Sequence, residues 1–276
     1  MIAPRTLLFI PGHRESMLAK AASAQADAVV FDLEDSVPLA ERVNARTLVS
    51  GVLANWQGGP RLFVRINAPR FEMLDADLQI VLRHPDVGIV VPKVDRPVEL
   101  SGMFERIGHH SRDVIVTIET ARSLLQVEAF ADTPGVDGLF LGGEDLTQAM
   151  GMRRTIDGSE LTVPRILVVA AARAAGIVAY DTICPEFRDL AIVARDADIA
   201  SALGFDGKFA IHPAQIEPIA KAFTPSDEKV DQARKIVDAY DEAVQAGRGA
   251  VAVDGQMIDP PVAERARAVL NRANRS

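Results

Sequence analysis

The sequence predicts an α/β fold, namely a (β/α)8 TIM barrel that carries a C-terminal helical extension. Eight short apolar runs recur within residues 1–223, and a segment with helical spacing of apolar residues follows nearly every run. Continuous apolar runs are typical of parallel strands that are buried on both faces. A single barrel of about 250 residues fits a chain of 276 residues. A doubly wound open sheet is the alternative.

The elements of the barrel follow from these runs in order. The predicted strands are residues 7–10, 28–31, 61–66, 87–91, 114–118, 139–141, 177–180 and 207–211. The predicted helices are residues 15–25, 39–54, 71–82, 97–107, a segment from 120, 163–175 and 187–203. The sixth strand ends at Gly142-Gly143, which we interpret as a sharp backbone turn that lies close to a ligand.

The composition changes after residue 223, so we predict two domains, a catalytic barrel over 1–223 and an extension over 224–276. No further strand of the barrel type occurs in the extension. Helices are predicted over 227–246 and from 260 to about 273, with a short extended piece over 251–258 between them. The extension is interpreted as a packing appendage or as a lid or subunit-contact element.

The composition also limits the class of protein. The formal net charge of −8 and the absence of a basic run argue against nucleic acid as a partner. No apolar run approaches the roughly 18 residues of a membrane span, and a secretory signal pattern is absent, so we expect a cytoplasmic protein without a membrane partner. Cys184 is the only cysteine, which excludes an intrachain disulfide and a cysteine-based metal site.

Charged and polar side chains stand where the predicted strands end, which is where barrel enzymes build their sites. They are Asp32, Glu34, Asp35, Arg65, Asn67, Lys93, Glu119, Glu144, Asp145 and His212. Glu119 and Asp145 follow neighbouring strands. Oxygen ligands without a histidine or cysteine cluster favour Mg²⁺, with Mn²⁺ as the alternative, and an α-keto or α-hydroxy acid would supply two more oxygens.

Each of these residues also has a structural interpretation. An acidic residue after a strand often caps the next helix. Arg65, inside an apolar strand, needs an anionic partner, which is either a structural carboxylate or a substrate carboxylate. Lys93 and Lys208 are interpreted as ion-pair partners of Glu34 and Asp35. His13 and Arg14 follow the first strand and form either a phosphate site or a solvated loop.

Several motifs, in order along the chain, resemble the citrate lyase beta-subunit-like family of the HpcH/HpaI aldolase superfamily, which includes malyl-CoA and citramalyl-CoA lyases. The motifs are RTLLFIPGHRESMLAKAASAQADAVVFDLEDSVPLAERVNAR, FVRIN, VVPKV, IETARSLL, LFLGGEDL and GFDGKFAIHPAQI. The resemblance covers nearly the whole chain. It implies a βα barrel that binds Mg²⁺, forms trimers or hexamers, and makes or breaks a carbon–carbon bond between an acyl-CoA and a 2-oxo acid.

Carried over by residue, the resemblance makes Glu119 and Asp145 the metal ligands and Arg65 the residue that holds substrate and stabilises charge. The segment GQMIDPP resembles one that in some relatives enters a neighbouring subunit's site, which implies an acid/base role for Asp259. The residues implied for coenzyme A phosphates are Arg14 and Lys20, although some relatives have lysine where this chain has Ser16. The residues expected around the metal are Glu34, Asp35 and Glu144, with Glu144 also expected at a helix start.

The sequence thus predicts a Mg²⁺-dependent carbon–carbon lyase that acts on a 3-hydroxyacyl-CoA such as citramalyl-CoA, malyl-CoA or citryl-CoA. Its products would be a 2-oxo acid and a short acyl-CoA. The alternatives are a class II aldolase that uses free pyruvate and an aldehyde, and a carrier-protein-dependent citrate lyase beta subunit active only in a complex. Thioester hydrolysis after condensation fits the same residues.

Overall fold

The computed structural model describes residues 3–69, 72–108 and 112–273. Eight parallel strands form a closed barrel in chain order. They are β1 (Thr6–Pro11), β2 (Ala28–Asp32), β3 (Arg61–Arg65), β4 (Gly88–Val91), β5 (Val114–Ile118), β6 (Gly138–Leu141), β7 (Val178–Asp181) and β8 (Gly207–Ala210). β1 pairs with β2 on one side and with β8 on the other, which closes the barrel. The predicted barrel is therefore confirmed, and the open sheet is excluded.

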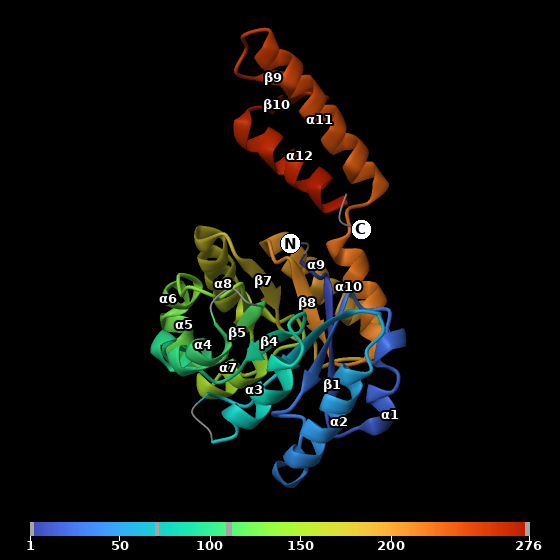
Figure 1. Cartoon of the computed structure of the whole chain (residues 1–276). Coiled ribbons are helices and arrows are strands. Elements are labelled where there is room, and N and C mark those ends of the chain that lie inside the picture. Colours follow the sequence, from blue (N-terminus) through green and yellow to red (C-terminus); the bar gives the residue numbers. More distant parts are fainter. Residues whose placement is uncertain (1–2, 70–71, 109–111, 274–276) are drawn as a thin grey trace. The chain divides into compact units, whose positions relative to one another are not determined.

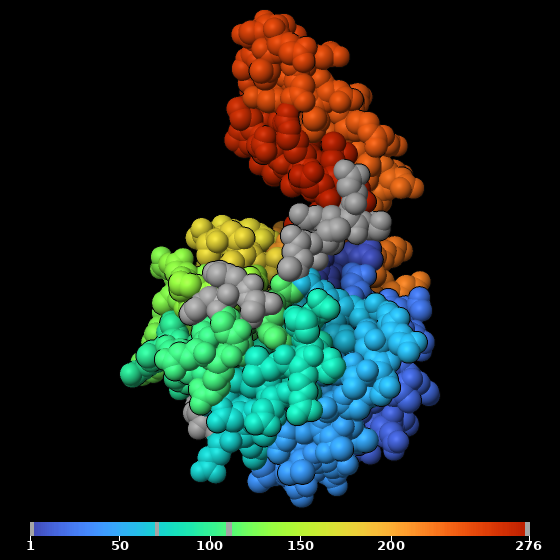
Figure 2. Space-filling model, viewed as in Figure 1, coloured from blue at the N-terminus to red at the C-terminus, as the bar shows by residue number. Residues whose placement is uncertain are grey.

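Helices surround this barrel (Figure 1). They are α1 (Glu15–Leu18), α2 (Arg42–Ala54), α3 (Leu74–Leu82), α4 (Ser101–Ile107), α5 (Ala121–Leu125), α6 (Val127–Ala131), α7 (Gly143–Ala149), α8 (Thr162–Ala175), α9 (Leu190–Leu203) and α10 (Ile216–Phe223). Figure 2 shows that their side chains form a nearly continuous surface on the face in view. Every residue of β2 and β5 is buried, so both faces of these strands are covered, which accounts for their continuous apolar runs.

The barrel interior is filled by large side chains. Phe63, Ile115, Phe140, Tyr180 and Phe209 belong to one buried apolar cluster that spans the strands. The rings of Phe140 and Phe209 stack with their centroids 3.9 Å apart. The interior is thus a packed core.

One predicted helix is wrong. Residues 15–25 form only the short helix α1 and a 3₁₀ turn at Ala21–Ser23. Leu18 and Ala21 are the buried residues of these two elements. A high alanine content favours helix, but a long helix on a barrel also needs a continuous apolar stripe to bury.

A second compact unit begins at Lys221. It contains α11 (Asp227–Gln245), β9 (Val251–Val253), β10 (Gln256–Ile258) and α12 (Pro260–Ala273). The predicted extended piece is a β-hairpin whose turn residues, Asp254 and Gly255, have φ angles of 50° and 79°. Positive φ at both central residues is typical of a type I′ turn, which Asp-Gly favours. Its core joins Val253, Ile258 and Ala263.

Along the described ranges, no helix combines the length and the apolar character that crossing a membrane requires.

Candidate active site

A pocket of about 270 Å³ lies at the carboxyl ends of the barrel strands. Its lining comes from seven strand ends or the turns after them: Phe9, Pro11, Asp32, Asp35, Ser36, Arg65, Glu119, Phe140, Gly142, Gly143, Glu144, Asp145, Thr182, Ile183 and Ile211. The sequence placed Arg65, Glu119 and Asp145 at one mouth, and all three line this pocket. We call the charged group of Asp32, Glu34, Asp35, Arg65, Lys93, Glu119 and Asp145 the site cluster.

Arg65, the last residue of β3, is bound by a structural carboxylate. Its Nε and Nη2 donate to Asp32 Oδ1 and Oδ2 at 2.7 and 2.6 Å, and the guanidinium lies 4.6 Å from the centroid of the Phe9 ring. Burial alone would raise the pKa of Asp32, but the charge and hydrogen bonds of Arg65 outweigh it and lower that pKa to about 2. The third nitrogen, Nη1, lies 3.8 Å from Glu34 Oε2, beyond hydrogen-bond distance. Arg65 therefore has a structural partner and one nitrogen directed toward other anions.

Lys93 connects the acidic residues after β2 to the end of β4. Its Nζ donates to Glu34 Oε1 at 2.6 Å and also binds Asp35, which confirms the predicted ion pairs for this lysine. Burial raises the pKa of Glu34 to about 7 despite the cations beside it. Among the described residues, Glu34 Oε2 finds no hydrogen-bond partner. This oxygen can accept a hydrogen bond from a group in the site.

Glu119 follows β5 and is 2% exposed. The backbone N–H of Lys93 donates to its Oε1, and Lys93 adopts a φ of 54° to do so, which is unusual for a residue with a side chain. Burial, and then the charge of Asp145, raise the pKa of Glu119 to about 8. A buried carboxylate next to another carboxylate is unfavourable unless a cation lies between or beside them.

The two glycines before Asp145 have a steric role. A Cβ at Gly142 would lie 2.5 Å from Glu119 Cβ, and a Cβ at Gly143 would lie 2.7 Å from Thr182 Oγ1. Gly142 has a φ of −82°, so left-handed backbone is not the reason for glycine. The close neighbours of the two glycines are thus other site residues, and their predicted approach to a ligand stays a prediction. The turn brings α7, with Asp145 in its first turn, against Glu119.

The donor set fits a hard divalent cation. Glu119 and Asp145 supply carboxylate oxygens from adjacent strands, and the excess of negative charge around them favours a cation. Within the described part of the chain, no group of three or more histidine, cysteine, aspartate or glutamate side chains is arranged to hold a metal. A bound ion would then take its other ligands from water and substrate, which is how Mg²⁺ is commonly held.

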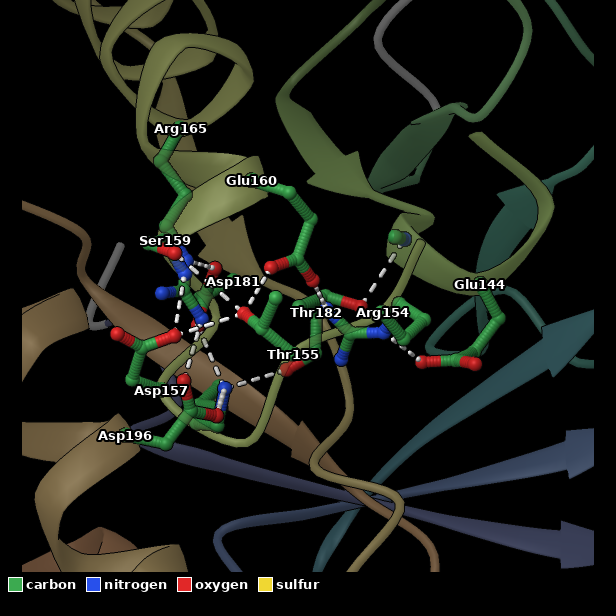
Figure 3. Close-up of polar contacts among 12 residues, drawn as sticks. Glu144, Arg154, Thr155, Asp157, Ser159, Glu160, Arg165, Asp181, Thr182 and Asp196 are labelled. Atoms are coloured by element: carbon green, nitrogen blue, oxygen red, sulfur yellow. Dashed lines mark hydrogen bonds and ion pairs between the residues drawn. The ribbon is translucent and has the colours of Figure 1, made fainter. Parts of the chain in front are cut away.

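The remaining predicted residues differ in their surroundings. Glu144 lines the pocket in the first turn of α7, and its Oε1 accepts from Arg154 Nε at 2.9 Å, as Figure 3 shows. Arg14 and Lys20 are exposed at α1 and just after it, and Arg14 stands three residues beyond Pro11 of the pocket. Asp259 belongs to the second unit, where its Oδ1 accepts from the Val262 N–H at 3.2 Å and caps α12.

Two features were wrong or missing in the sequence prediction. Lys208 binds Asp181 and Asp196 instead of Glu34 and Asp35, because β8 lies next to β7 in the barrel. Thr182 lines the pocket but was not selected. The signal was present, since Thr182 directly follows the seventh strand just as Glu119 directly follows the fifth.

A family model described as HpcH/HpaI aldolase/citrate lyase matches residues 5–213, which include every barrel residue of the site. The chain belongs to this family. The family resemblance and the enzyme class, a carbon–carbon lyase, are thereby confirmed.

Relatives of this family match over nearly the full length. The chain is 34% identical to citrate lyase subunit beta of Leuconostoc mesenteroides subsp. cremoris, covering 98% of this chain and 93% of that protein. It is 33% identical to (3S)-malyl-CoA thioesterase of Cereibacter sphaeroides, covering 98% and 94%.

Solved structures resemble it as well. The structure of protein CitE from Mycobacterium tuberculosis in complex with magnesium, acetoacetate and coenzyme A has a TM-score of 0.84 and 32% identity, covering 99% of this chain and all of that one. The citrate lyase beta subunit of M. tuberculosis complexed with oxaloacetate and magnesium has a TM-score of 0.70 and 31% identity, covering 81% and 98%.

Proposed function

We propose that the protein is a Mg²⁺-dependent lyase that cleaves or forms the carbon–carbon bond of a 3-hydroxyacyl-CoA such as citramalyl-CoA, malyl-CoA or citryl-CoA. The products of cleavage are a 2-oxo acid and a short acyl-CoA. The observation that carries this proposal is the carboxylate pair Glu119 and Asp145 in one pocket with Arg65, whose Nη1 lies 3.8 Å from Glu34, beyond hydrogen-bond distance. The relatives that bind magnesium with oxaloacetate, or with acetoacetate and coenzyme A, support it.

Magnesium held by Glu119 and Asp145 would supply the Lewis acidity that lowers the pKa of the substrate hydroxyl. Mn²⁺ has similar ligand preferences and is the alternative metal. Loss of the hydroxyl proton to water would let the electron pair of the O–H bond form the ketone of the 2-oxo acid while the carbon–carbon bond breaks. The electrons of that bond move into the thioester, which leaves as an enolate.

The residues around this step have separate tasks. Arg65 Nη1 would donate to the oxygen on which negative charge develops. Glu34 and Asp35, and Glu144 farther out, would accept hydrogen bonds from waters on the metal, which orients them. The buried Glu34 Oε2, which accepts no hydrogen bond from the described residues, supports this task. Asp259 would give a proton to the enolate carbon, or remove one in the direction of condensation.

Coenzyme A would lie along the exposed cations Arg14 and Lys20, whose positive charges match its phosphates. The M. tuberculosis structure with coenzyme A covers 99% of this chain, which includes the C-terminal extension. The two chains therefore share the extension, for which we propose a role as a lid or subunit contact. We propose a homotrimer or hexamer in which Asp259 reaches the site of a neighbouring subunit.

The metal part of the proposal is tested with Glu119→Ala and Asp145→Ala. Both variants and the wild type are assayed against a panel of 3-hydroxyacyl-CoA esters, with free 2-oxo acid as the readout, with Mg²⁺ and with EDTA. Each substitution should lower kcat/KM at least about a hundredfold, because the metal stabilises the developing charge. Activity that survives both substitutions, or EDTA, contradicts a metal-dependent reaction.

Sharing of Asp259 is tested by mixing two inactive proteins. Asp259→Ala and Glu119→Ala subunits, denatured together and reassembled, should recover part of the wild-type activity if the aspartate acts in a neighbouring subunit. Mixed oligomers are verified with two affinity tags. A mixture that contains such oligomers and stays inactive at every ratio argues against a shared site.

The names of relatives favour two further reactions. Citrate lyase subunit beta relatives support a carrier-dependent subunit, which would be inert on CoA esters until its partner proteins are added. The (3S)-malyl-CoA thioesterase relative supports hydrolysis of the thioester, which would release free CoA in the same panel. A class II aldolase would use pyruvate and an aldehyde without any thioester.

A further inference from the structure

A second group of charged side chains lies beside the site cluster, between β7, β8, α8 and α9. We call Arg165, Asp181, Asp196 and Lys208 the β7–β8 cluster. Figure 3 shows Arg165, Asp181 and Asp196 meeting there. Arg165 donates to both Asp181 oxygens at 2.9 and 3.0 Å and to Asp196 at 2.6 Å, and Lys208 lies 2.5 Å from Asp181 and 2.7 Å from Asp196.

The buried position of this cluster needs a reason other than stability. Asp181 and Lys208 have no exposed surface, and Arg165 is 1% exposed. Buried ion pairs stabilise a fold no better than apolar residues of similar volume, because both charges must leave water. In some proteins such groups fix one arrangement of the chain. The relevant question is therefore which part of the barrel this cluster fixes.

Lys208 holds the residue that follows β7. Its Nζ donates to the carbonyl oxygen of Thr182 at 2.6 Å, while the same nitrogen binds Asp181. Thr182 is 1% exposed and lines the pocket. Its backbone is thus fixed from the β7–β8 cluster, and its side chain faces the active site.

The Thr182 hydroxyl in turn holds the turn that carries a metal ligand. The Gly143 N–H donates to Thr182 Oγ1 at 3.0 Å, and a side chain at Gly143 would collide with that oxygen. Gly143 is the first residue of α7, and Asp145 is two residues farther along the same helix. On the other side, Gly142 donates to the Ile118 carbonyl at 3.0 Å and lies against Glu119. The turn is clamped between β5 and Thr182.

We propose that Thr182 is a positioning residue for Asp145: its hydroxyl, held in place through Lys208, sets the position of α7 and so the spacing between Asp145 and Glu119. The inference rests on the proposed role of these carboxylates as metal ligands. Groups that orient metal ligands from behind typically change metal affinity 10- to 100-fold when they are removed.

The test measures metal binding without turnover. Binding of Mn²⁺ alone is followed by electron paramagnetic resonance in the full-length protein, as the wild type, Thr182→Val and Thr182→Ser, all well below their melting temperatures. Thr182→Val should weaken Mn²⁺ about 10- to 100-fold, because the Gly143 N–H loses its acceptor. Thr182→Ser keeps the acceptor and should bind within about threefold of the wild type. If Thr182→Val does not fold, it is replaced by Thr182→Ala, which removes the hydroxyl without adding any bulk.

Two controls separate the possible failures. Thr133→Val makes the same chemical change at a hydroxyl just after α6, which donates to the Ala129 carbonyl, and should leave Mn²⁺ affinity unchanged. Asp145→Ala should abolish tight binding. If the wild type does not bind Mn²⁺, or Asp145→Ala binds as tightly, the proposed metal site is wrong. If that site holds but Thr182→Val binds like the wild type, or serine fails to rescue, the positioning role is overturned.

Discussion

The two charged clusters at the ends of the strands differ in their balance of charge. The β7–β8 cluster joins two cations to two carboxylates, and its lysine is fully buried. The site cluster contains Arg65 and Lys93 with five carboxylates, of which Asp32, Glu34 and Asp35 pair with these cations, and most of its members line a pocket. Because unmatched negative charge is costly in a protein interior, the first cluster is complete in itself, whereas the second requires an added cation.

The largest effect on stability is expected from removing a cation from the balanced cluster. Lys208→Met leaves two buried carboxylates with one partner, which should lower the free energy of unfolding by about 3–5 kcal/mol. Lys93→Met, in the site cluster, should cost less because the Lys93 side chain is 25% exposed and water can replace it. Urea unfolding of both variants measures the difference. Equal losses of unfolding free energy would mean that the two clusters do not differ in how much they depend on their lysine.

Added metal should act on the site cluster alone. At a hundredfold excess over its Kd, Mg²⁺ should stabilise the EDTA-treated wild type by about 2.7 kcal/mol through binding to the folded state. Glu119→Gln should lose this gain, whereas the control Thr133→Val, which lies away from the site cluster, should keep it. Thermal melting with and without Mg²⁺ gives the values. A gain that persists in Glu119→Gln would place the ion elsewhere.

Within the site cluster, the Asp32–Arg65 pair should give stability its own dependence on low pH. The pKa of Asp32 is lowered to about 2, so its contribution to stability is present above its ordinary pKa near 3.9 and is lost as the pH falls toward 2. This contribution is about 2 kcal/mol. The free energy of unfolding of Asp32→Asn, measured against pH, should fall less steeply between pH values of about 4 and 2. The same slope in both proteins would contradict the pairing with Arg65.

The smallest effects come from single methyl groups. Gly142→Ala should weaken Mn²⁺ about tenfold, because its Cβ would lie 2.5 Å from Glu119 Cβ and displace that carboxylate. Gly51→Ala is the matched control, since no atom lies within 4 Å of its Cβ inside α2, and it should stabilise the protein by up to about 1 kcal/mol. Unchanged Mn²⁺ affinity in Gly142→Ala would show that Glu119 can move without weakening metal binding.

The sequence predicted the barrel well because burial on both faces leaves continuous apolar runs, which strands such as Val114–Ile118 display directly. It also predicted Glu119, Asp145 and Arg65, since strand ends share one mouth in this fold. The roles of these residues, and of Asp259, Arg14 and Lys20, stay predictions until they are tested. Ion pairs between residues of different strands were harder to predict, because they depend on distances in space. Lys208 was therefore assigned to the wrong carboxylates.

The helix over residues 15–25 failed for a related reason. Alanine content is a local property, but the length of a helix on a barrel depends on how much of its surface the neighbouring elements cover. The steric role of Gly142 was likewise invisible, because the residue that it would strike, Glu119, belongs to another strand. A turn-forming glycine and a contact glycine look the same in a sequence.

At position 93, the backbone conformation and the side-chain contacts favour different residues. The φ of 54° at Lys93 suits glycine or asparagine, while its ammonium group is needed by Glu34 and Asp35. Any ordinary substitution therefore disturbs the side chain, even when it relieves the backbone. Protein semisynthesis offers a way around this: an ester in place of the amide at residue 93 deletes the N–H that reaches Glu119 and leaves the ammonium intact. At position 93, a backbone substitution can therefore separate the role of the N–H from that of the ammonium group, whereas a side-chain substitution changes the ammonium group in every case.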